Sequence, residues 1–375
     1  MQTNVNGKTI SDALAVLKRY AGSGTGSAKG FTLAELRVPD GGGTLIIRRW
    51  AWKTFTDVSA SIMANGGTAG TAYVAADALT DAVKGTKGML TLTLDGDRLT
   101  VTSENGGASL RLENDGDFPA PMAFPPRPFA VIADGERDAM RGVVAAAAGG
   151  SDARAVLTGV NFDHNEGEAV TTDTYRMHAA KLRPMHASGI IPADVLRIGL
   201  ATGSGPLELH ADEAGKRFLL TYRMVKGTKN APRIVAVSAY GMMVEGPFPN
   251  YAAIVQPARE HVEYEWTVTD AAGTADVARS FADNRNTPLM LSAAAGSSVL
   301  ASATYPENGT REASPPIVTD GKTDVLASIA FNPKYFADAV KHAGDGAPIR
   351  FRDPMRAAYF DGGDRYALLM PMRVN

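Results

Sequence analysis

Short segments in which apolar and polar residues alternate make up much of the chain. Alternation with a period of two is typical of strands that bury one face of an antiparallel sheet. The expected strands include 43–49, 89–95, 98–103, 109–113, 155–163, 207–211, 217–222, 350–352 and 366–370. Between two of them, Asp95 and Gly96 favour a tight hairpin turn, because glycine readily adopts the positive φ that such a turn requires.

Fewer segments carry the helical pattern, in which apolar residues recur three or four positions apart. In the first of them Ile10, Leu14 and Leu17 share one face, and Ser11 or Asp12 is expected to cap the start of the helix. Further amphipathic helices are expected at 75–84, 134–148, 192–201, 271–283 and 333–343. Antiparallel strands with a few helices predict an α+β fold.

Two short patterns recur along the chain, which indicates internal repetition. Residues 73–79 resemble 189–196 and, more loosely, 330–336, at spacings of 117 and 141 residues. Residues 117–121 resemble 247–251 at a spacing of 130 residues, and one third of the 375-residue chain is 125. Three related units, each with two helices and a run of antiparallel strands, fit these spacings.

Candidate boundaries between the three units follow from proline. The proline-rich stretch 119–128 is interpreted as a linker, because proline removes backbone donors and stiffens the chain. A second, weaker break is expected near Pro257. Residues 226–243 are interpreted as an insertion in the middle unit, which explains the longer second spacing. The predicted domains are 1–125, 126–257 and 258–375.

Composition narrows the class of protein. The chain contains no run of about 18 apolar residues, and its first twenty residues lack the layout of a signal peptide, so no membrane partner and a cytoplasmic location are expected. It has no cysteine, which excludes disulfides and thiolate metal sites. The net charge is −2, so binding to DNA would require the 38 Lys and Arg residues to gather on one face.

Catalytic and cofactor motifs are missing from the sequence. Residues 22–30 are rich in glycine, but a phosphate-binding P-loop needs Gly directly before its Lys, and Ala28 stands there instead. The six histidines show no metal-ligand spacing, and no G-x-S-x-G motif is present. We therefore expect a protein that is not an enzyme and that has no metal site and no cofactor.

Three segments resemble the bacterial DNA polymerase III beta sliding clamps. Residues 157–163, followed by 169–178, are similar to that family's strand pair and its T-D-x-[HY]-R-[LM] turn. Residues 245–251 are similar to its G-x-[FY]-P-D-Y element, and 366–374 to its closing strand and M-P-M-R tail. The three segments occur in the family's order and at whole-chain spacing, so the chain is identified as a divergent member.

The resemblance implies a fold and a function. The fold would be three repeated clamp domains, each of antiparallel sheets backed by two helices, and a head-to-tail homodimer would close a ring. This DNA sliding clamp, or processivity factor, would encircle double-stranded DNA without reading its sequence and would tether a DNA polymerase. An ATP-dependent clamp loader would place it on DNA. Cations expected to face the DNA are Lys18, Arg19, Lys29, Lys84, Arg137, Arg141, Arg154, Arg197, Arg279, Lys334 and Lys341.

In the same family a short peptide of each partner enters an apolar pocket. The resemblance implies that the pocket of this chain is formed by Leu157, Thr172, Thr174, Tyr175, Arg176, Met177, Pro249, Ile254, Leu368, Leu369, Met370, Pro371, Met372 and Arg373. A pocket lined by flexible methionines suits several different peptides. Leu368 and Met370 could equally be core residues. Ala253 stands where the family usually has a basic residue, and Thr174-Tyr175 replaces the commoner Gly-His, so the peptide preference is expected to differ.

Dimer contacts and alternative functions are less clear from the sequence. Leu110, Leu112 and Phe281 are candidates for the dimer interface, although each could equally lie in the interior. One alternative is a clamp-like platform that binds peptides without encircling DNA. The other is a repeated all-β binding protein that is unrelated to clamps.

Overall fold

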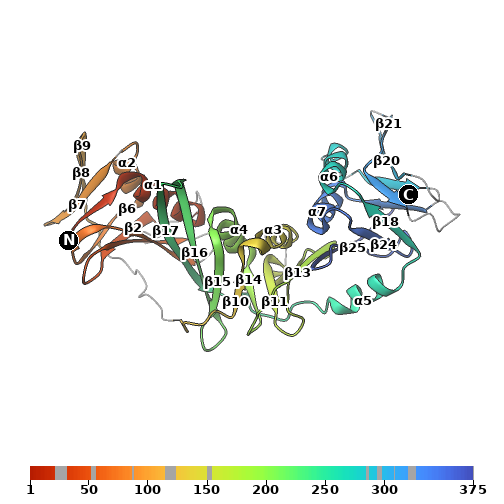
Figure 1. Cartoon of the computed structure of the whole chain (residues 1–375), viewed down its shortest axis with the longest axis horizontal. Helices are drawn as coiled ribbons and strands as arrows, with labels where there is room; N and C mark the ends of the chain where they lie inside the picture. The colour runs from red at the N-terminus through yellow and green to blue at the C-terminus, as the bar shows by residue number, and fades with distance from the viewer. Residues whose placement is uncertain are drawn as a thin grey trace. The chain divides into compact units, whose positions relative to one another are not determined.

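The computed structural model of the chain forms two compact units. Unit 1 comprises Met1–Gly135, Pro184–His186 and Asp194–Val244, and unit 2 comprises Glu136–Arg183, Ala187–Ala193 and Glu245–Asn375. Figure 1 shows the chain coloured from its N-terminus to its C-terminus. The residues that the structure describes are 1–21, 32–51, 56–86, 88–114, 124–149, 154–283, 287–293, 298–307, 309–319 and 327–374.

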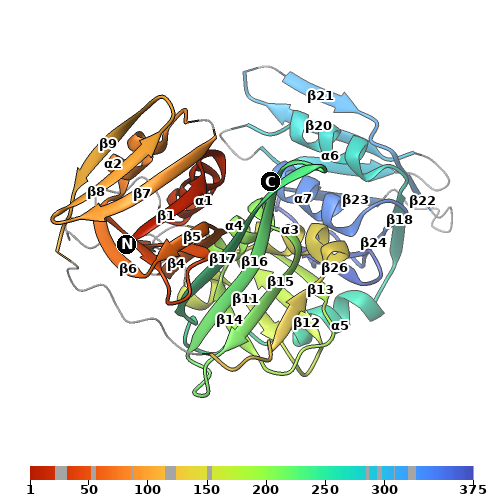
Figure 2. The ribbon, with the colours of Figure 1, turned by 60° about the vertical axis from the view of Figure 1, so that its left-hand side comes forward.

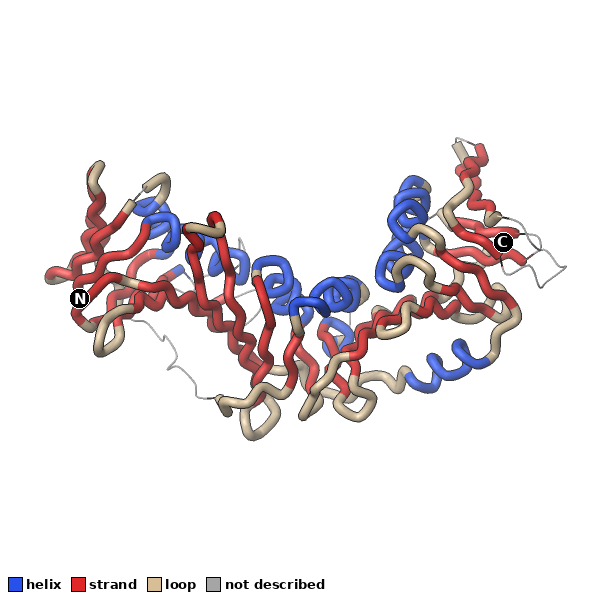
Figure 3. Tube along the Cα trace, viewed as in Figure 1, coloured by secondary structure: helices blue, strands red, loops and turns tan. Residues whose placement is uncertain are grey.

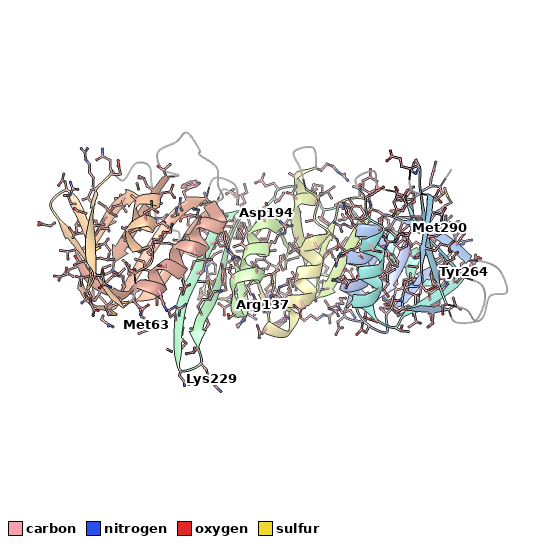
Figure 4. All side chains as sticks on the ribbon, turned by 90° about the horizontal axis from the view of Figure 1, so that it is seen from above. Met63, Arg137, Asp194, Lys229, Tyr264 and Met290 are labelled. Carbon is pink, nitrogen blue, oxygen red and sulfur yellow. The ribbon has the colours of Figure 1, made fainter. Side chains whose placement is uncertain are left out.

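Unit 1 contains two antiparallel sheets. The five-stranded sheet has the order β5 (Asn65–Thr68), β1 (Gln2–Asn6), β7 (Met89–Asp95), β8 (Arg98–Ser103) and β9 (Gly106–Arg111). The eight-stranded sheet has the order β10 (Ala130–Ile132), β15 (Ser204–Ala211), β16 (Arg217–Thr228), β17 (Ala231–Met242), β4 (Thr56–Met63), β3 (Thr44–Ala51), β2 (Leu33–Val38) and β6 (Gly70–Ala75). The segment interpreted as an insertion, 226–243, comprises the end of β16, the turn with Lys229 at its tip (Figure 4) and the whole of β17, which pairs with β4 inside the eight-stranded sheet.

Three helices belong to unit 1, namely α1 (Gly7–Ala21), α2 (Ala76–Val83) and α4 (Ala193–Thr202). Helix α1 packs on the eight-stranded sheet with Ile10, Leu14 and Leu17 buried, as the apolar spacing predicts. Its cap was predicted wrongly. The helix begins at Gly7, and the Asn6 Oδ1 atom accepts hydrogen bonds from the Lys8 and Thr9 amides, both at 3.1 Å. An asparagine in this position satisfies donors that have no partner inside the helix.

Unit 2 also contains two antiparallel sheets. Figure 3 distinguishes the helices, strands and loops of the chain by colour. The nine-stranded sheet has the order β14 (Gly189–Pro192), β11 (Gly159–Asp163), β12 (Glu168–Thr172), β13 (Arg176–Lys181), β26 (Arg365–Leu369), β25 (Ala358–Asp361), β24 (Pro348–Phe351), β18 (Tyr264–Val268) and β22 (Ile317–Thr319). The four-stranded sheet has the order β21 (Gly309–Ala313), β20 (Leu300–Tyr305), β19 (Leu289–Ala293) and β23 (Ala327–Phe331).

The helices of unit 2 are α3 (Arg137–Ala145), α5 (Ala252–Glu260), α6 (Ala271–Ser280) and α7 (Pro333–Ala343), with short 3-10 turns at Asp134–Glu136 and Ala155–Thr158. Helices α6 and α7 lie side by side (Figure 1). The aromatic rings of Phe331, Phe336 and Phe360 are fully buried in this unit, with centroids 5.5 Å apart for the first two and 5.8 Å for the last two. Burial of such rings supplies much of the core's stability.

Most of the predicted elements are present, and the predicted α+β class is confirmed. Two details differ. Residues 155–158 form a 3-10 turn before strand β11, not the start of a longer strand, and helix α5 was not predicted at all. Helix α5 has no buried residue and contains Pro257, so it carries neither the apolar stripe nor the composition that identifies a helix from sequence. No helix in the described part of the chain is long and apolar enough to cross a membrane.

Candidate functional site

Two of the sequence motifs meet in the middle of the nine-stranded sheet. Strands β13 and β26 lie side by side (Figure 2), with Met177 opposite Leu368 and Arg176 opposite Leu369. Beyond the last pair, the Met370 amide donates a hydrogen bond to the Tyr175 carbonyl oxygen at 2.8 Å. The turn before β13 and the segment after β26 therefore lie together, although about 190 residues separate them in sequence.

The turn from Thr172 to Arg176 is held by its own side chains. The Asp173 Oδ1 atom accepts from the amides of Tyr175 and Arg176, both at 3.0 Å, and the Thr172 hydroxyl donates to the Arg176 carbonyl at 2.7 Å. Among the described residues, Thr174 alone is a non-glycine residue with positive φ, at 78°. A β-branched residue is strained there. The turn leaves the Tyr175 side chain 64% exposed.

The side chain of Arg176 stabilises this turn by hydrogen bonds. Its guanidinium donates to the Asp173 Oδ2 atom at 3.0 Å, to the Asp338 Oδ2 atom of α7 at 2.7 Å and to the Ala145 carbonyl of α3 at 2.8 Å. The group also lies 4.1 Å from the centre of the Tyr335 ring. Only 10% of the side chain is exposed, so its donors are already occupied by the protein.

Two tyrosine hydroxyls donate to carboxylates of the same sheet, and the one from Tyr251 attaches the segment before α5. The Tyr251 hydroxyl donates to the Asp163 carboxylate at 3.0 Å, and the Tyr366 hydroxyl donates to the Glu168 Oε1 atom at 2.9 Å. Burial raises the pKa of Glu168, and the hydroxyls of Tyr366 and Tyr251 oppose that rise. Burial, followed by the nearby Glu168 charge, raises the pKa of Tyr251. Tyr251 is thus held in place beside Pro249.

The turn at 172–176, the segment around Tyr251 and the end of strand β26 line a cavity of about 190 Å³. It is lined by Arg154, Thr172, Thr174, Tyr175, Arg176, Met177, Pro249, Asn250, Tyr251, Ile254, Ala357, Leu368 and Met370. Nine of the fourteen predicted pocket residues line it, namely Thr172, Thr174, Tyr175, Arg176, Met177, Pro249, Ile254, Leu368 and Met370. The motifs predicted from sequence therefore converge on one concave, largely apolar surface.

The other five predicted pocket residues do not line the cavity. Leu157 and Leu369 are buried, at 3% and 0% exposed. Pro371, Met372 and Arg373 follow the last strand, where the Met372 amide donates to the Ala330 carbonyl at 2.7 Å. Sequence reasoning missed Asn250 and Tyr251, which lie in a motif already singled out, and Arg154, which was assigned to DNA. Ala357 gave no sequence signal.

Most of the cations predicted to face DNA are exposed on helices, but several are already paired with carboxylates. Arg141 pairs with Asp138 and Arg197 with Asp194. Arg279 lies 3.2 Å from Asp338, and Lys341 lies 3.9 Å from Asp276. Five of the predicted cations are exposed and do not take part in the ion pairs given above, namely Lys18, Arg19, Lys84, Arg154 and Lys334. Lys29 lies outside the described residues.

Two predicted contact residues are buried within the chain. Arg137 is 5% exposed, so the prediction that it faces DNA is corrected. Phe281 is 1% exposed in the core of unit 2, so its ring is not available to a second copy and the interface prediction is corrected. Leu110 and Leu112 are partly exposed, and Leu110 lies on β9, an edge strand of the five-stranded sheet.

Comparisons with known proteins give a result at the level of structure only. No protein-family model and no curated protein sequence matches the chain. Among solved structures, the DNA polymerase sliding clamp from Caulobacter crescentus matches with a TM-score of 0.80 at 18% identity. The polymerase beta subunit of Streptococcus pyogenes matches at 0.81 and 17%, and the Helicobacter pylori beta clamp bound to a DNA ligase peptide at 0.78 and 15%. All of both chains is covered in each case. The chain therefore has the fold of the bacterial DNA polymerase III beta sliding clamps.

Proposed function

We propose that this chain is a non-catalytic DNA sliding clamp. A homodimeric ring would encircle duplex DNA, and the cavity beside Met370 would hold peptides of a polymerase and other partners. The observation that carries the proposal is the match to bacterial clamps over the full length of both chains. The cavity formed by the motifs of those clamps supports it. Within the described residues no cluster of His, Asp and Glu could hold a metal ion.

Contact with DNA would be electrostatic and independent of sequence. Sliding requires attraction to phosphate without contacts to the bases, because base contacts would hold the protein at one register. Without the buried Arg137, the helices other than α5 carry eight Lys and Arg residues against seven Asp and Glu, a net charge of +1, whereas the whole chain carries −2. The helices are therefore the more basic part of the chain, and we assign them to the DNA side.

Closure of the ring would use free edges of the sheets. We assign three domains to each chain, 1–125, 126–257 and 258–375, and thus six to a ring. In the described structure β9 and β21 are edge strands whose unpaired backbone groups can accept another strand. Pairing β9 of one copy with β21 of the next would place Leu110 in the interface. Sedimentation equilibrium should then give twice the chain mass of 39.4 kDa, and a monomer at micromolar concentration would contradict the ring.

The tether would be a peptide anchored by apolar side chains. A cavity of about 190 Å³ is smaller than the ~300–1,000 Å³ of typical ligand pockets, so it suits one or two side chains of a peptide. The Helicobacter pylori clamp with the same fold was solved with a DNA ligase peptide bound, which supports this assignment. An ATP-dependent loader would open the ring in the cytoplasm. Loss of peptide binding in Ile254→Asp tests the assignment, because Ile254 is exposed and lines the cavity.

A platform that binds peptides without encircling DNA is the second candidate. The observation that favours it is the pairing of Arg141, Arg197, Arg279 and Lys341 with nearby aspartates, which reduces the attraction of the helices for phosphate. Both candidates require the peptide cavity. They differ in whether the protein remains on circular DNA.

A further inference from the structure

A second cavity adjoins the first along helix α5. It has a volume of about 360 Å³ and is lined by Ala253, Ile254, Pro257, Ala258, His261, Arg352, Met355, Arg356, Ala357 and Met370. Ile254, Ala357 and Met370 line both cavities. The two cavities are therefore neighbouring parts of one groove, which is longer than the pocket predicted from sequence.

The side chains around the junction of the cavities are apolar and open to solvent. Ile254 is 55% exposed, Met355 is 57% exposed and Met370 is 41% exposed. Large apolar side chains that gather at one exposed place mark an interaction site more often than isolated ones do. Methionine adapts its shape to different ligands, so two of the three can follow the contour of a bound chain.

The far wall of the second cavity is cationic. Arg352 and Arg356 lie in the segment between β24 and β25, and their side chains are 45% and 64% exposed. None of the residues that line either cavity is Asp or Glu. With Arg154 at the first cavity, the groove offers cations to a ligand and no carboxylate in its lining.

Each of the two arginines has one exposed acidic neighbour. The Arg352 Nε atom lies 3.5 Å from Glu263, and the Arg356 Nε atom lies 3.4 Å from Asp353. Exposed pairs at these distances contribute little to stability, so a carboxylate of a ligand can replace or share them. A guanidinium also presents a fork of donors that matches a carboxylate.

Helix α5 contributes no charged residue to the lining of either cavity. Helix α5 presents Ala253 at the second cavity, next to Ile254. At the second cavity, the cations that can select an acidic ligand are therefore Arg352 and Arg356. This places the charged contact on one side of the apolar junction, so the apolar and the acidic residues of the ligand are expected in separate, adjacent stretches.

We propose that the two cavities form one groove for an acidic peptide, with apolar side chains in the first cavity and neighbouring Asp or Glu residues over Arg352 and Arg356. The inference rests on the proposed peptide-binding function and names the chemical class of its partner. Neutral or basic sequences beside the apolar anchor bind more weakly. The order of the residues along the peptide is either apolar then acidic or the reverse, because the groove does not fix the chain direction.

Three fluorescein-labelled peptides test the proposal by fluorescence anisotropy. The first is Gly-Gly-Leu-Leu-Phe-Gly-Asp-Asp-Glu, the second has Asn-Asn-Gln in place of Asp-Asp-Glu, and the third has the acidic triplet at the other end, Asp-Asp-Glu-Gly-Leu-Leu-Phe-Gly-Gly. At low salt, where charge contacts are least screened, one acidic peptide should bind about tenfold more tightly than the neutral peptide. The double variant Arg352→Gln/Arg356→Gln should lower its affinity to that of the neutral peptide.

A matched control separates a local contact from the overall charge. The double variant Lys226→Gln/Lys229→Gln removes the same two charges from exposed positions on the β16–β17 hairpin, and it should keep the preference. Equal affinity for acidic and neutral peptides, or a preference that survives in Arg352→Gln/Arg356→Gln, overturns the inference and leaves the proposed function standing. Binding of no peptide, or binding unaffected by Ile254→Asp, overturns both.

Discussion

The Met370 amide donates to the Tyr175 carbonyl at 2.8 Å, and this bond joins the turn before β13 to the segment that follows β26. It continues the ladder of the two strands past their last pair, so it sets where Met370 lies relative to Tyr175. Both side chains line the first cavity and both are exposed. The shape of the cavity thus depends on a backbone contact between two distant parts of the sequence.

Relief of strain at Thr174 should stabilise the protein. Its φ of 78° is unfavourable for a β-branched residue, whereas glycine adopts it freely. We expect Thr174→Gly to raise the free energy of unfolding by about 1 kcal/mol, measured by urea denaturation. Thr102→Gly, at an exposed position in β8, is the control and should lower it by about 0.5–1 kcal/mol. A loss of stability in both variants would show that Thr174 is not strained.

Replacement of Arg176 should destabilise the folded protein. Arg176→Ala leaves Asp173, Asp338 and the Ala145 carbonyl without their shared donor in a site that is only partly open to solvent. We expect a loss of about 3 kcal/mol in the free energy of unfolding, because Asp173, only 11% exposed, loses its counter-charge, whereas Asp338 keeps Arg279. Arg176→Lys should recover only part of it, since an ammonium cannot reproduce the planar fork.

The control for Arg176 is Arg373→Ala, which removes an exposed arginine at the end of the chain. It should change the free energy of unfolding by no more than about 0.5 kcal/mol. A similar small effect of both alanine variants would contradict the role assigned to Arg176.

The buried histidine pair should make the protein less stable in acid. The rings of His178 and His342 stack with centroids 4.7 Å apart, and they donate to the carbonyls of Gly142 at 2.7 Å and Ala179 at 2.9 Å. Burial lowers the pKa of His342 to about 4 and holds the pKa of His178 well below 6.5. Nearby Arg176 and Arg365 add to the lowering, and no hydrogen-bond partner in the described structure meets the other ring nitrogens.

The direction in which stability changes with pH follows from proton uptake by the two histidines. The unfolded chain binds protons at these histidines near pH 6.5 and the folded chain does not, so stability is full above pH 6.5 and falls towards pH 4. For His342 the loss is about 3 kcal/mol by pH 4. Urea denaturation at pH 7.5 and pH 5 should show this loss developing, and His342→Gln should reduce it. The same slope in the variant would assign the acid sensitivity to other groups.

Glu168 should have the opposite effect on stability, which it lowers as the pH rises. Its folded pKa is raised, so its contribution favours the folded state below the unfolded pKa of 4.5 and is lost as pH rises through the folded value. Glu168→Gln keeps an acceptor for the Tyr366 hydroxyl without a buried charge. The variant should therefore be at least as stable as the natural protein at pH 7.5. A large loss at that pH would mean that the charge itself holds Tyr251 and Tyr366.

The sequence was sufficient for the fold class and for most of the cavity, and the errors have physical causes. Leu368 and Leu369 were both assigned to the pocket, yet consecutive residues of a strand face opposite sides of the sheet, so only Leu368 lines it. Phe281 was offered as an interface residue because exposure cannot be read from an apolar side chain alone. The role of Arg176 depends on Asp338, 162 positions away, which no local pattern connects to it.

The central claim is that the protein encircles DNA, and retention on circular DNA tests it most directly. The protein is loaded with an ATP-dependent clamp loader onto a nicked circular plasmid, separated from free protein at high salt, and the plasmid is then cut at one site. High salt removes charge-driven binding and leaves topological linkage. The account predicts retention on the circle and release after the cut. Equal retention before and after cutting, or none on either form by a folded dimer that binds the peptides, would contradict encirclement.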